Sequence, residues 1–267
     1  MSVLTSNSFQ GKVILLTGAS SPMGESLTEL LAKSGGTVYA CDLKVNESSS
    51  AKIHSVEVDV TDHDDFKKTV DMIYATHGQI DYLFNFTGLN IIGPATSFQP
   101  EEWKEVLDRN ILGTVAGINL VYPGMVERRS GHIINVSSIT GDSGHTTATP
   151  HACSKAFIYG LHQSMSPEAA RYKVHLTTVM PGYLQTDLFQ PSRVVDNHPE
   201  ELKETASLSR RTPEKMSEYI LRQVLAERKT IFCGGRILWH LSHWFPLPLR
   251  VLHNHFLKPF LKNPTAP

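Results

Sequence analysis

The chain has 267 residues, of which 40% are hydrophobic and 19% are charged, and its formal net charge is −1. This composition is sufficient for one sizeable hydrophobic core and excludes an intrinsically disordered chain. The balance of 25 Lys and Arg residues against 26 Asp and Glu residues provides no overall field for binding nucleic acid.

The cysteines and the N-terminal residues indicate a reducing compartment. Cys41, Cys153 and Cys233 are widely spaced and odd in number, so they predict neither a disulfide framework nor a paired zinc motif. The first residues lack the basic and apolar regions of a secretory signal, and no run of about 18 apolar residues predicts a membrane-spanning helix. We therefore expect a cytoplasmic protein.

Short apolar strands alternate with amphipathic helices along most of the chain. Strands are predicted at 12–18, 37–43, 53–60, 80–86, 132–138, 174–180 and 230–233. Helices are predicted at 24–33, 62–76, 100–121, 150–172 and 213–228, with a loop at 181–211. This alternation predicts a single-domain, doubly wound α/β fold over 1–235, with a parallel Rossmann-type sheet flanked by helices. Its ligands would bind beyond the carboxyl ends of the strands.

The turn after the first strand has features of a dinucleotide-binding site. Gly18 follows the strand and Gly24 opens the helix, so main-chain N–H groups and the helix dipole would face a pyrophosphate. Asp42 ends the second strand, where its carboxylate can accept hydrogen bonds from the adenosine ribose and repel a 2′-phosphate. These positions favour NAD over NADP. A tight turn at Gly18 and a cap at Asp42 are the structural alternatives.

Six further patterns follow one another in order. They are Thr17-Gly18-Ala19-Ser20-Ser21-Pro22-Met23-Gly24, Asp59-Val60, Asn85-Phe86-Thr87-Gly88, Asn110-Ile111-Leu112-Gly113, Asn135-Val136-Ser137-Ser138 and Pro181-Gly182 with Thr186. Together they resemble the motifs of the classical short-chain dehydrogenase/reductase family, from about Gly11 to Cys233. The resemblance implies that the cofactor would be bound by Gly18, Ser20, Ser21, Met23, Gly24, Asp42, Asp59, Val60, Asn85, Thr87, Gly88, Lys155, Pro181, Gly182 and Thr186.

The catalytic pattern of the family is matched with one substitution. In the family a serine polarises the carbonyl, a tyrosine delivers the proton, a lysine lowers the tyrosine pKa and holds the nicotinamide ribose, and an asparagine maintains a water-linked proton relay. Ser138, Lys155 and Asn110 match these positions, whereas the tyrosine position is occupied by His151. His151 and Lys155 are four residues apart on one predicted helix, so their side chains can lie together.

Two interpretations of His151 stay open. Imidazole is a competent acid or base near neutral pH. However, its terminal nitrogen reaches roughly 2 Å less far than a tyrosine oxygen, and about 1 Å of misplacement can cost on the order of 10²-fold in rate. A neighbouring ammonium also disfavours imidazolium. His151 is therefore either an atypical acid/base or a remnant with no proton to give.

Pro22 is a second departure, because it stands where the motif has its middle glycine. Proline adds a ring and removes an N–H, although its fixed φ suits the first turn of a helix. We expect the turn to form and the cofactor to bind less well.

Mostly apolar residues are expected at the substrate end. They are Ile91, Ile92, His145, Tyr183, Leu184, Leu188 and Phe189. This lining favours a hydrophobic ketone, alcohol or polyketide-like substrate, and loop packing is the alternative. His145 is either a second proton carrier or a solvated loop histidine.

The C-terminal extension, residues 236–267, differs from the rest of the chain in charge and in aromatic content. The segment 228–267 holds six cations and no anion, which leaves −7 for residues 1–227. Its aromatic residues, Trp239, Trp244, Phe245, Phe256 and Phe260, predict contact of 236–262 with a membrane surface. A dimer-packing or substrate-covering extension is the alternative. No metal site is expected, because His240, His243, His253 and His255 have no acidic or cysteine partner.

Three functions are compatible with this pattern, since a fold does not determine a function. The first is an NAD(H)-dependent oxidoreductase that acts on a hydrophobic carbonyl or alcohol through Asn110, Ser138, His151 and Lys155. The second is a catalytically silent subunit of a hetero-oligomer, which pairs with an active homologue through helices 100–121 and 150–172. The third is a lyase, isomerase or cyclase that uses the same scaffold.

Overall fold

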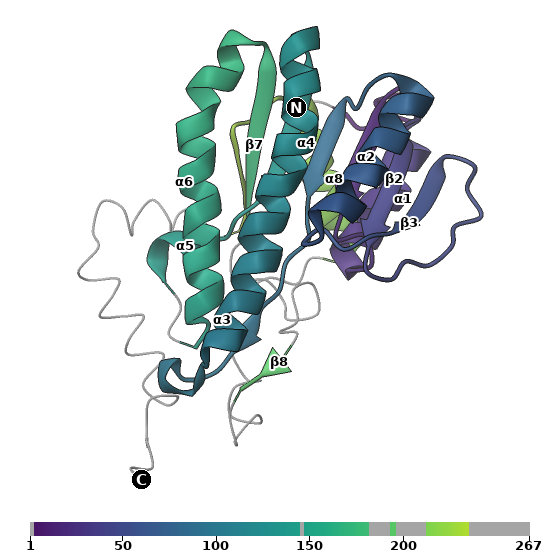
Figure 1. Ribbon diagram of the computed structural model, residues 1–267. Coiled ribbons are helices and arrows are strands. Elements are labelled where there is room, and N and C mark those ends of the chain that lie inside the picture. Colours follow the sequence, from purple (N-terminus) through teal and green to yellow (C-terminus); the bar gives the residue numbers. More distant parts are fainter. Residues whose placement is uncertain (1–2, 145–146, 182–192, 196–211, 235–267) are drawn as a thin grey trace.

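The computed structural model describes residues 3–144, 147–181, 193–195 and 212–234 (Figure 1). The described strands are β1 (Val13–Thr17), β2 (Thr37–Asp42), β3 (Ile53–Glu57), β4 (Tyr82–Asn85), β5 (Ile91–Ile92), β6 (Gly131–Val136), β7 (Val174–Pro181), β8 (Arg193–Val194) and β9 (Thr230–Cys233). The described α-helices are α1 (Pro22–Lys33), α2 (His63–His77), α3 (Pro100–Leu107), α4 (Gly113–Arg128), α5 (Thr140–Ser143), α6 (Thr149–Arg171) and α8 (Pro213–Leu225).

The main sheet confirms the predicted doubly wound topology. Its strand order is β3-β2-β1-β4-β6-β7-β9, and every neighbouring pair is parallel. The order reverses between β1 and β4, so the two halves of the sheet diverge from this pair. Ligands of open α/β sheets bind at such a reversal, beyond the carboxyl ends of the strands.

The central strand β1 buries both of its faces, because helices cover the sheet on both sides, whereas the edge strand β3 is partly exposed. In β1, Ile14 and Leu16 pack in a core cluster with residues of α1 and α8. Val13 and Leu15 point the other way and pack in a second cluster with residues of α2, α4 and α6. This explains why β1 is an almost continuous apolar run in which polar residues do not alternate with apolar ones.

The predicted helix at 100–121 is divided into several parts. After α3 the chain forms a π-helical turn, η2 (Asp108–Leu112), and then continues as α4 to Arg128. π-Turns are rare and often occur at functional sites. Periodicity alone could not predict this turn, because it changes the rotation of the helix without changing its apolar composition.

Four short elements were also absent from the prediction. β5 and β8 pair with each other and lie apart from the main sheet (Figure 1). A 3₁₀ turn, η1 (Ala95–Ser97), and α5 follow β5 and β6. Elements of two to four residues are too short to give a periodic pattern.

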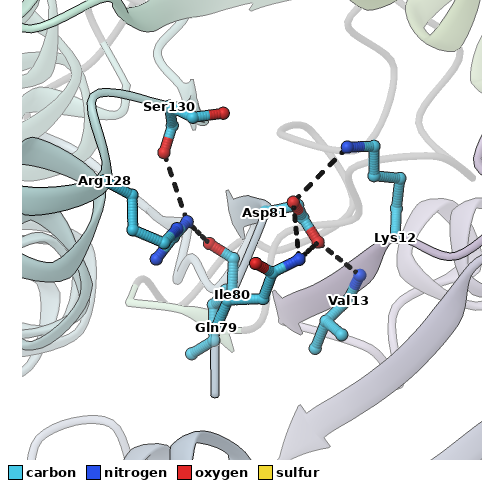
Figure 2. A network of polar contacts seen from close by, with 7 residues as sticks. All are labelled: Lys12, Val13, Gln79, Ile80, Asp81, Arg128 and Ser130. Atoms are coloured by element: carbon cyan, nitrogen blue, oxygen red, sulfur yellow. Dashed lines mark hydrogen bonds and ion pairs between the residues drawn. The ribbon is translucent and has the colours of Figure 1, made fainter. Parts of the chain in front are cut away.

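A polar network joins the amino ends of β1 and β4, at the edge opposite the expected site. Figure 2 shows Asp81 accepting hydrogen bonds from the Val13 main-chain N–H at 2.9 Å and from Gln79 Nε2 at 3.1 Å, with Lys12 Nζ at 3.5 Å. Beside it, Arg128 donates to the carbonyl oxygens of Ile80 and Ser130. This network ties the start of β4 to β1 and to the end of α4.

In the part of the chain that the structure describes, no helix is long and apolar enough to cross a membrane. The proposed extension at 236–267 and most of the loop at 181–211 lie outside the described residues.

Candidate active site

Gly18 lies where the strand order of the sheet reverses, and its surroundings leave no room for a side chain. Its φ is +78°, and an added Cβ would lie only 2.4 Å from the carbonyl carbon of Phe86. The Phe86 N–H also donates to the Thr17 carbonyl at 3.2 Å. The turn after β1 and the turn after β4 therefore contact each other at the carboxyl edge of the sheet.

The turn before α1 forms as predicted, but it offers few donors to an anion. Ser21 is the N-cap, and its Oγ accepts from the Gly24 N–H at 3.0 Å and donates to the Gly18 carbonyl at 2.8 Å. Pro22 is the first helical residue and has no N–H. Of the first three helical amides, one is missing and the Gly24 amide is already used. The buried Met23 side chain accepts from Ser217 Oγ of α8, so its side chain belongs to the core.

The predicted adenosine residues line one cavity beyond β2 and β3. It is formed by Asp42, Leu43, Val58, Asp59, Val60, Thr87 and Arg109. Asp42 accepts hydrogen bonds from the Ser20 N–H and hydroxyl and from the Leu43 N–H. Asp59 accepts from the Thr61 N–H and hydroxyl. The structure thus brings Ser20, Asp42, Asp59 and Val60 together, and it adds Arg109, which no sequence motif indicated.

The end of β4 and the segment after it contain buried polar atoms without a partner among the described residues. They are Asn85 Oδ1, Thr87 Oγ1 and Asn90 Oδ1. Asn85 donates from Nδ2 to Asn135 Oδ1 of β6 at 2.8 Å, which orients its amide. An unpaired buried polar atom is costly, so these three oxygens are positions that a bound ligand or water would satisfy.

Asn110 holds the next residues of that segment in place. Its Oδ1 accepts from the Leu89 N–H at 2.6 Å, and its Nδ2 donates to the Leu89 carbonyl at 3.0 Å and to Ser154 Oγ at 2.8 Å. Both Nδ2 hydrogens are therefore used. Asn110 links the π-turn, the 88–89 segment and the first turns of α6.

His151 is oriented by the same segment. Its Nδ1 lies 3.1 Å from the Leu89 carbonyl oxygen, which thus accepts from both Asn110 and His151. Ser154 Oγ donates to the His151 carbonyl at 2.7 Å and closes the connection to Asn110. A carbonyl oxygen can only accept, so His151 carries a hydrogen on Nδ1.

Lys155 lies one helical turn further along α6 and is almost fully buried. Its Nζ donates to the Val136 carbonyl at 2.9 Å, and it lies beside Gly88, 3.5 Å from the place of an added Cβ. Burial lowers the pKa of the Lys155 ammonium to about 8. His151 therefore contacts a carbonyl group of the 88–89 segment, and Lys155 contacts the carbonyl group of the last residue of β6.

Ser138 follows β6 and presents a hydroxyl whose own hydrogen is weakly engaged. Its Oγ accepts from the Thr140 N–H at 3.1 Å and from Thr140 Oγ1 at 2.8 Å. It donates to the Pro181 carbonyl only at 3.4 Å. The neighbouring Ser137 is structural, since it donates to the Lys155 carbonyl at 2.7 Å.

The expected substrate residues Ile91 and Ile92 are buried in protein contacts. Ile92 packs with Ala148 and Val194, and Ile91 packs in a cluster with Val195 at its edge. Arg193 secures this segment to α3 through Glu105 at 3.1 Å and Glu102 at 3.6 Å. His145, Gly182, Tyr183, Leu184, Thr186, Leu188 and Phe189 lie outside the described residues.

The site residues suit the adenosine and nicotinamide ends of a dinucleotide better than its pyrophosphate. Gly18 opens the turn, the unpaired Thr87 hydroxyl lies beside the cavity of Asp42 and Asp59, and Lys155 and Ser138 lie further along the same edge. The pyrophosphate turn is the weakest part, because Pro22 contributes no donor. Among the described residues, no cluster of three or more metal-ligating side chains occurs.

The family model for short chain dehydrogenases matches residues 12–196, which include β1, the cavity and α6. The chain belongs to the short-chain dehydrogenase family. Members of this family bind NAD or NADP and are oxidoreductases. The matched range contains Asn110, Ser138, His151 and Lys155.

Two curated relatives are similar to the chain over two thirds of its length or more. A 3-oxoacyl-(acyl-carrier-protein) reductase of Thermotoga maritima is 31% identical over 86% of this chain and 96% of its own. An uncharacterized oxidoreductase of Staphylococcus saprophyticus is 34% identical over 67% of this chain and 81% of its own.

Two solved structures are also similar. A short-chain dehydrogenase from Streptomyces avermitilis covers 94% of this chain and 99% of its own with a TM-score of 0.76, at 20% identity. A gluconate 5-dehydrogenase from Burkholderia cenocepacia, solved with NADP and tartrate, has a TM-score of 0.61 at 27% identity over 69% of this chain and 76% of its own.

Proposed function

We propose that this chain is an NAD(H)-dependent oxidoreductase that interconverts a hydrophobic alcohol and its carbonyl compound, with His151 as the proton-transferring residue. The observation that carries the proposal is the contact between His151 Nδ1 and the Leu89 carbonyl. The bound dinucleotide supplies the hydride acceptor or donor. The chain's own residues bind it, orient the substrate and move the proton.

The Leu89 carbonyl selects one tautomer of His151. With the hydrogen on Nδ1, the neutral ring has its lone pair on Nε2 and can accept a proton there. A neutral imidazole predominates above about pH 7 for an ordinary histidine. This tautomer favours the oxidation direction, in which Nε2 takes the proton from the alcohol oxygen. In the opposite direction, imidazolium would return that proton to the carbonyl oxygen.

Ser138 and Lys155 have supporting roles in this proposal. The Ser138 hydroxyl accepts twice from Thr140, so its own hydrogen can turn from the distant Pro181 carbonyl to a substrate oxygen. Lys155 is buried beside Gly88 and holds a positive charge below about pH 8. An ammonium there suits a ribose hydroxyl and stabilises negative charge that develops on the substrate oxygen.

The charges of the adenosine cavity support NAD over NADP. Asp42 and Asp59 both line it, and only Arg109 balances them among the lining residues. Two carboxylates disfavour a 2′-phosphate of charge near −2. The bound NADP of the Burkholderia enzyme belongs to that protein, and its preference does not carry over to a cavity with these residues.

The hydrophobic substrate in this proposal rests on the apolar residues Tyr183, Leu184, Leu188 and Phe189 of the sequence, because Ile91 and Ile92 pack against protein. Leu112 and Phe157 are exposed on η2 and α6, which supports pairing of these helices with a second copy or with another family member. We propose a homo-oligomer, and a mixed oligomer is the alternative.

Direct binding and turnover measurements test the proposal. The purified full chain is titrated with NADH, NADPH, NAD and NADP, and is then assayed with NAD on a panel of aliphatic and aromatic secondary alcohols. We expect NADH to bind more tightly than NADPH and at least one hydrophobic alcohol to be oxidised. Absence of NADH binding at millimolar concentration contradicts the proposal. Tight binding without turnover on any alcohol or ketone indicates the silent subunit, and cofactor-independent conversion indicates a non-redox enzyme.

A further inference from the structure

Arg109 lines the adenosine cavity because the helix that carries it packs closely against Val60, in the loop after β3. Gly113 begins α4 four residues after Arg109, and an added Cβ there would lie 2.6 Å from Val60 Cγ2. This glycine thus permits direct contact between the helix backbone and Val60. Residues four apart share a helix face, so Arg109 is on the side that faces Val60 and the cavity.

The Arg109 guanidinium is only weakly engaged by protein groups. Its nearest carboxylate, Glu105 Oε1, is 3.8 Å away, and the other oxygen of Glu105 pairs with Arg193 at 3.1 Å. The Arg109 side chain is about one third exposed. It is therefore a planar cation at the rim of a cavity whose other charged residues, Asp42 and Asp59, are both anionic.

We propose that Arg109 is an adenine-binding residue, whose guanidinium stacks on the base of the adenosine-containing cofactor. Val60 forms the apolar side of the cavity, and Asp42 lies at the end where the ribose would be held. A guanidinium stacks on an aromatic ring through its planar face and its charge. This inference rests on the proposed function only in that the chain binds an adenine dinucleotide.

The alternative ligand for this cation is a 2′-phosphate, and the local charges oppose it. Asp42 and Asp59 line the same small cavity, so a phosphate that reached Arg109 would also approach both carboxylates. Adenine is neutral and has no such penalty. Stacking also compensates for the missing donor at Pro22, since it adds affinity at the opposite end of the dinucleotide.

Cofactor fragments separate the adenosine half from the nicotinamide half. Calorimetric titration of the full chain would use ADP-ribose, 2′-phospho-ADP-ribose and reduced nicotinamide mononucleotide. We expect Arg109→Ala to weaken ADP-ribose binding by about 3- to 30-fold, the range of a cation–aromatic contact. Reduced nicotinamide mononucleotide should bind within twofold of the unchanged protein. Arg109→Lys should lose most of the same affinity, because it keeps the charge without the plane.

Lys104→Ala is the matched control. Lys104 is an exposed cation five residues earlier, paired with Asp108, and it does not line the cavity. We expect no change in the binding of any fragment. Far-UV circular dichroism and thermal melting verify that each variant is folded, and Arg109→Gln serves as a second neutral variant.

The outcomes distinguish this inference from the proposed function. Equal ADP-ribose binding by Arg109→Ala and the unchanged chain overturns the role of Arg109 alone. A loss confined to 2′-phospho-ADP-ribose, or full affinity in Arg109→Lys, also overturns stacking. Fragment-specific losses in a chain that oxidises no alcohol support Arg109 and contradict the proposed function. A chain that binds no adenosine fragment contradicts both.

Discussion

A single carbonyl group, that of Leu89, organises the candidate active site at the scale of residues. It accepts from Asn110 and from His151, and Asn110 also bonds Ser154, which in turn donates to the His151 carbonyl. Two of the family's four catalytic positions are thereby connected without a direct contact between them. A histidine whose Nδ1 is held in this way is oriented for chemistry at Nε2.

His151→Asn tests whether that nitrogen transfers a proton. The asparagine amide can place an N–H donor where His151 Nδ1 contacts the Leu89 carbonyl, but it has no atom at the Nε2 position and cannot accept and release a proton at neutral pH. We expect kcat for alcohol oxidation to fall by about 10²- to 10⁴-fold, the usual contribution of general acid–base catalysis. NADH affinity, measured by fluorescence titration, should change less than twofold. Unchanged kcat in this variant would instead identify His151 as a remnant.

At the scale of elements, the N-terminus of α1 is well capped but offers few hydrogen-bond donors to an anion. Ser21 caps the helix and Pro22 preorganises its first turn. The same two residues remove donors from the place where a pyrophosphate would lie, since Ser21 Oγ occupies the Gly24 amide. Stability and phosphate binding are therefore opposed at this turn.

Pro22→Gly should separate these two effects. The glycine restores an N–H and removes the ring, so we expect NADH to bind up to about tenfold more tightly, which equals ~1.4 kcal/mol. The unfolding free energy should decrease by about 0.4–1 kcal/mol, because glycine gains more freedom in the unfolded chain. Fluorescence titration and urea denaturation measure the two quantities.

Pro213→Gly is the control for that experiment. Pro213 also begins a helix, α8, after the cap Thr212. We expect a similar loss of stability with unchanged NADH affinity. If Pro22→Gly behaves in the same way as Pro213→Gly, the proline does not limit cofactor binding.

At the scale of the whole molecule, the central sheet contains a buried neutral histidine. His132 of β6 is 5% exposed, and its Nε2 bonds Thr177 Oγ1 of β7 at 2.7 Å. Since Thr177 Oγ1 donates its own hydrogen to the Arg228 carbonyl, Nε2 of His132 is the donor. Burial, with a smaller contribution from His175, lowers the pKa of His132 to about 3.

This histidine should make the fold acid-sensitive. Because its folded pKa lies below the unfolded value of about 6.5, the unfolded chain binds the proton first as the pH falls. The contribution of neutral His132 to the unfolding free energy is therefore fully present above about pH 6.5. It decreases by on the order of 1 kcal/mol per pH unit as the pH falls towards 3. His132→Gln keeps the donor to Thr177, and we expect its unfolding free energy to fall less steeply between pH 6.5 and 4. The exposed His63→Gln variant should retain the wild-type slope, and equal slopes for both variants would contradict this origin.

The charge of the whole chain is divided between the acidic body and the basic 228–267 segment. We propose that residues 236–262 contact anionic membrane surfaces, because their cations and aromatic residues suit the headgroup region. The full chain should sediment with anionic liposomes at low salt and be released by salt. A chain ending at Cys233 should stay in the supernatant. Equal sedimentation of the two forms would contradict the proposal.

The alternation of strands and helices predicted most of the fold, and the short motifs predicted most of the candidate site. The π-turn and the β5–β8 pair escaped prediction, because each depends on a few residues held by distant partners. Met23 and Ile92 were expected near ligands, yet their side chains are core, since hydrophobicity alone does not distinguish pocket from packing. Arg109 belongs to no motif, and only the contact between Gly113 and Val60 brings its helix face to the cavity.

The sequence by itself determined the alternation of strands and helices along the chain, the glycine turn, the acidic adenosine end and the replacement of tyrosine by histidine, because these follow from residue type and local spacing. Only the tertiary structure decided which atoms these side chains contact. Leu89 and His151 are 62 positions apart in the chain, and their hydrogen bond depends on the packing of η2 and α6 around one turn. The tautomer of a histidine and the environment of an arginine are properties of such long-range contacts, and no local pattern encodes them.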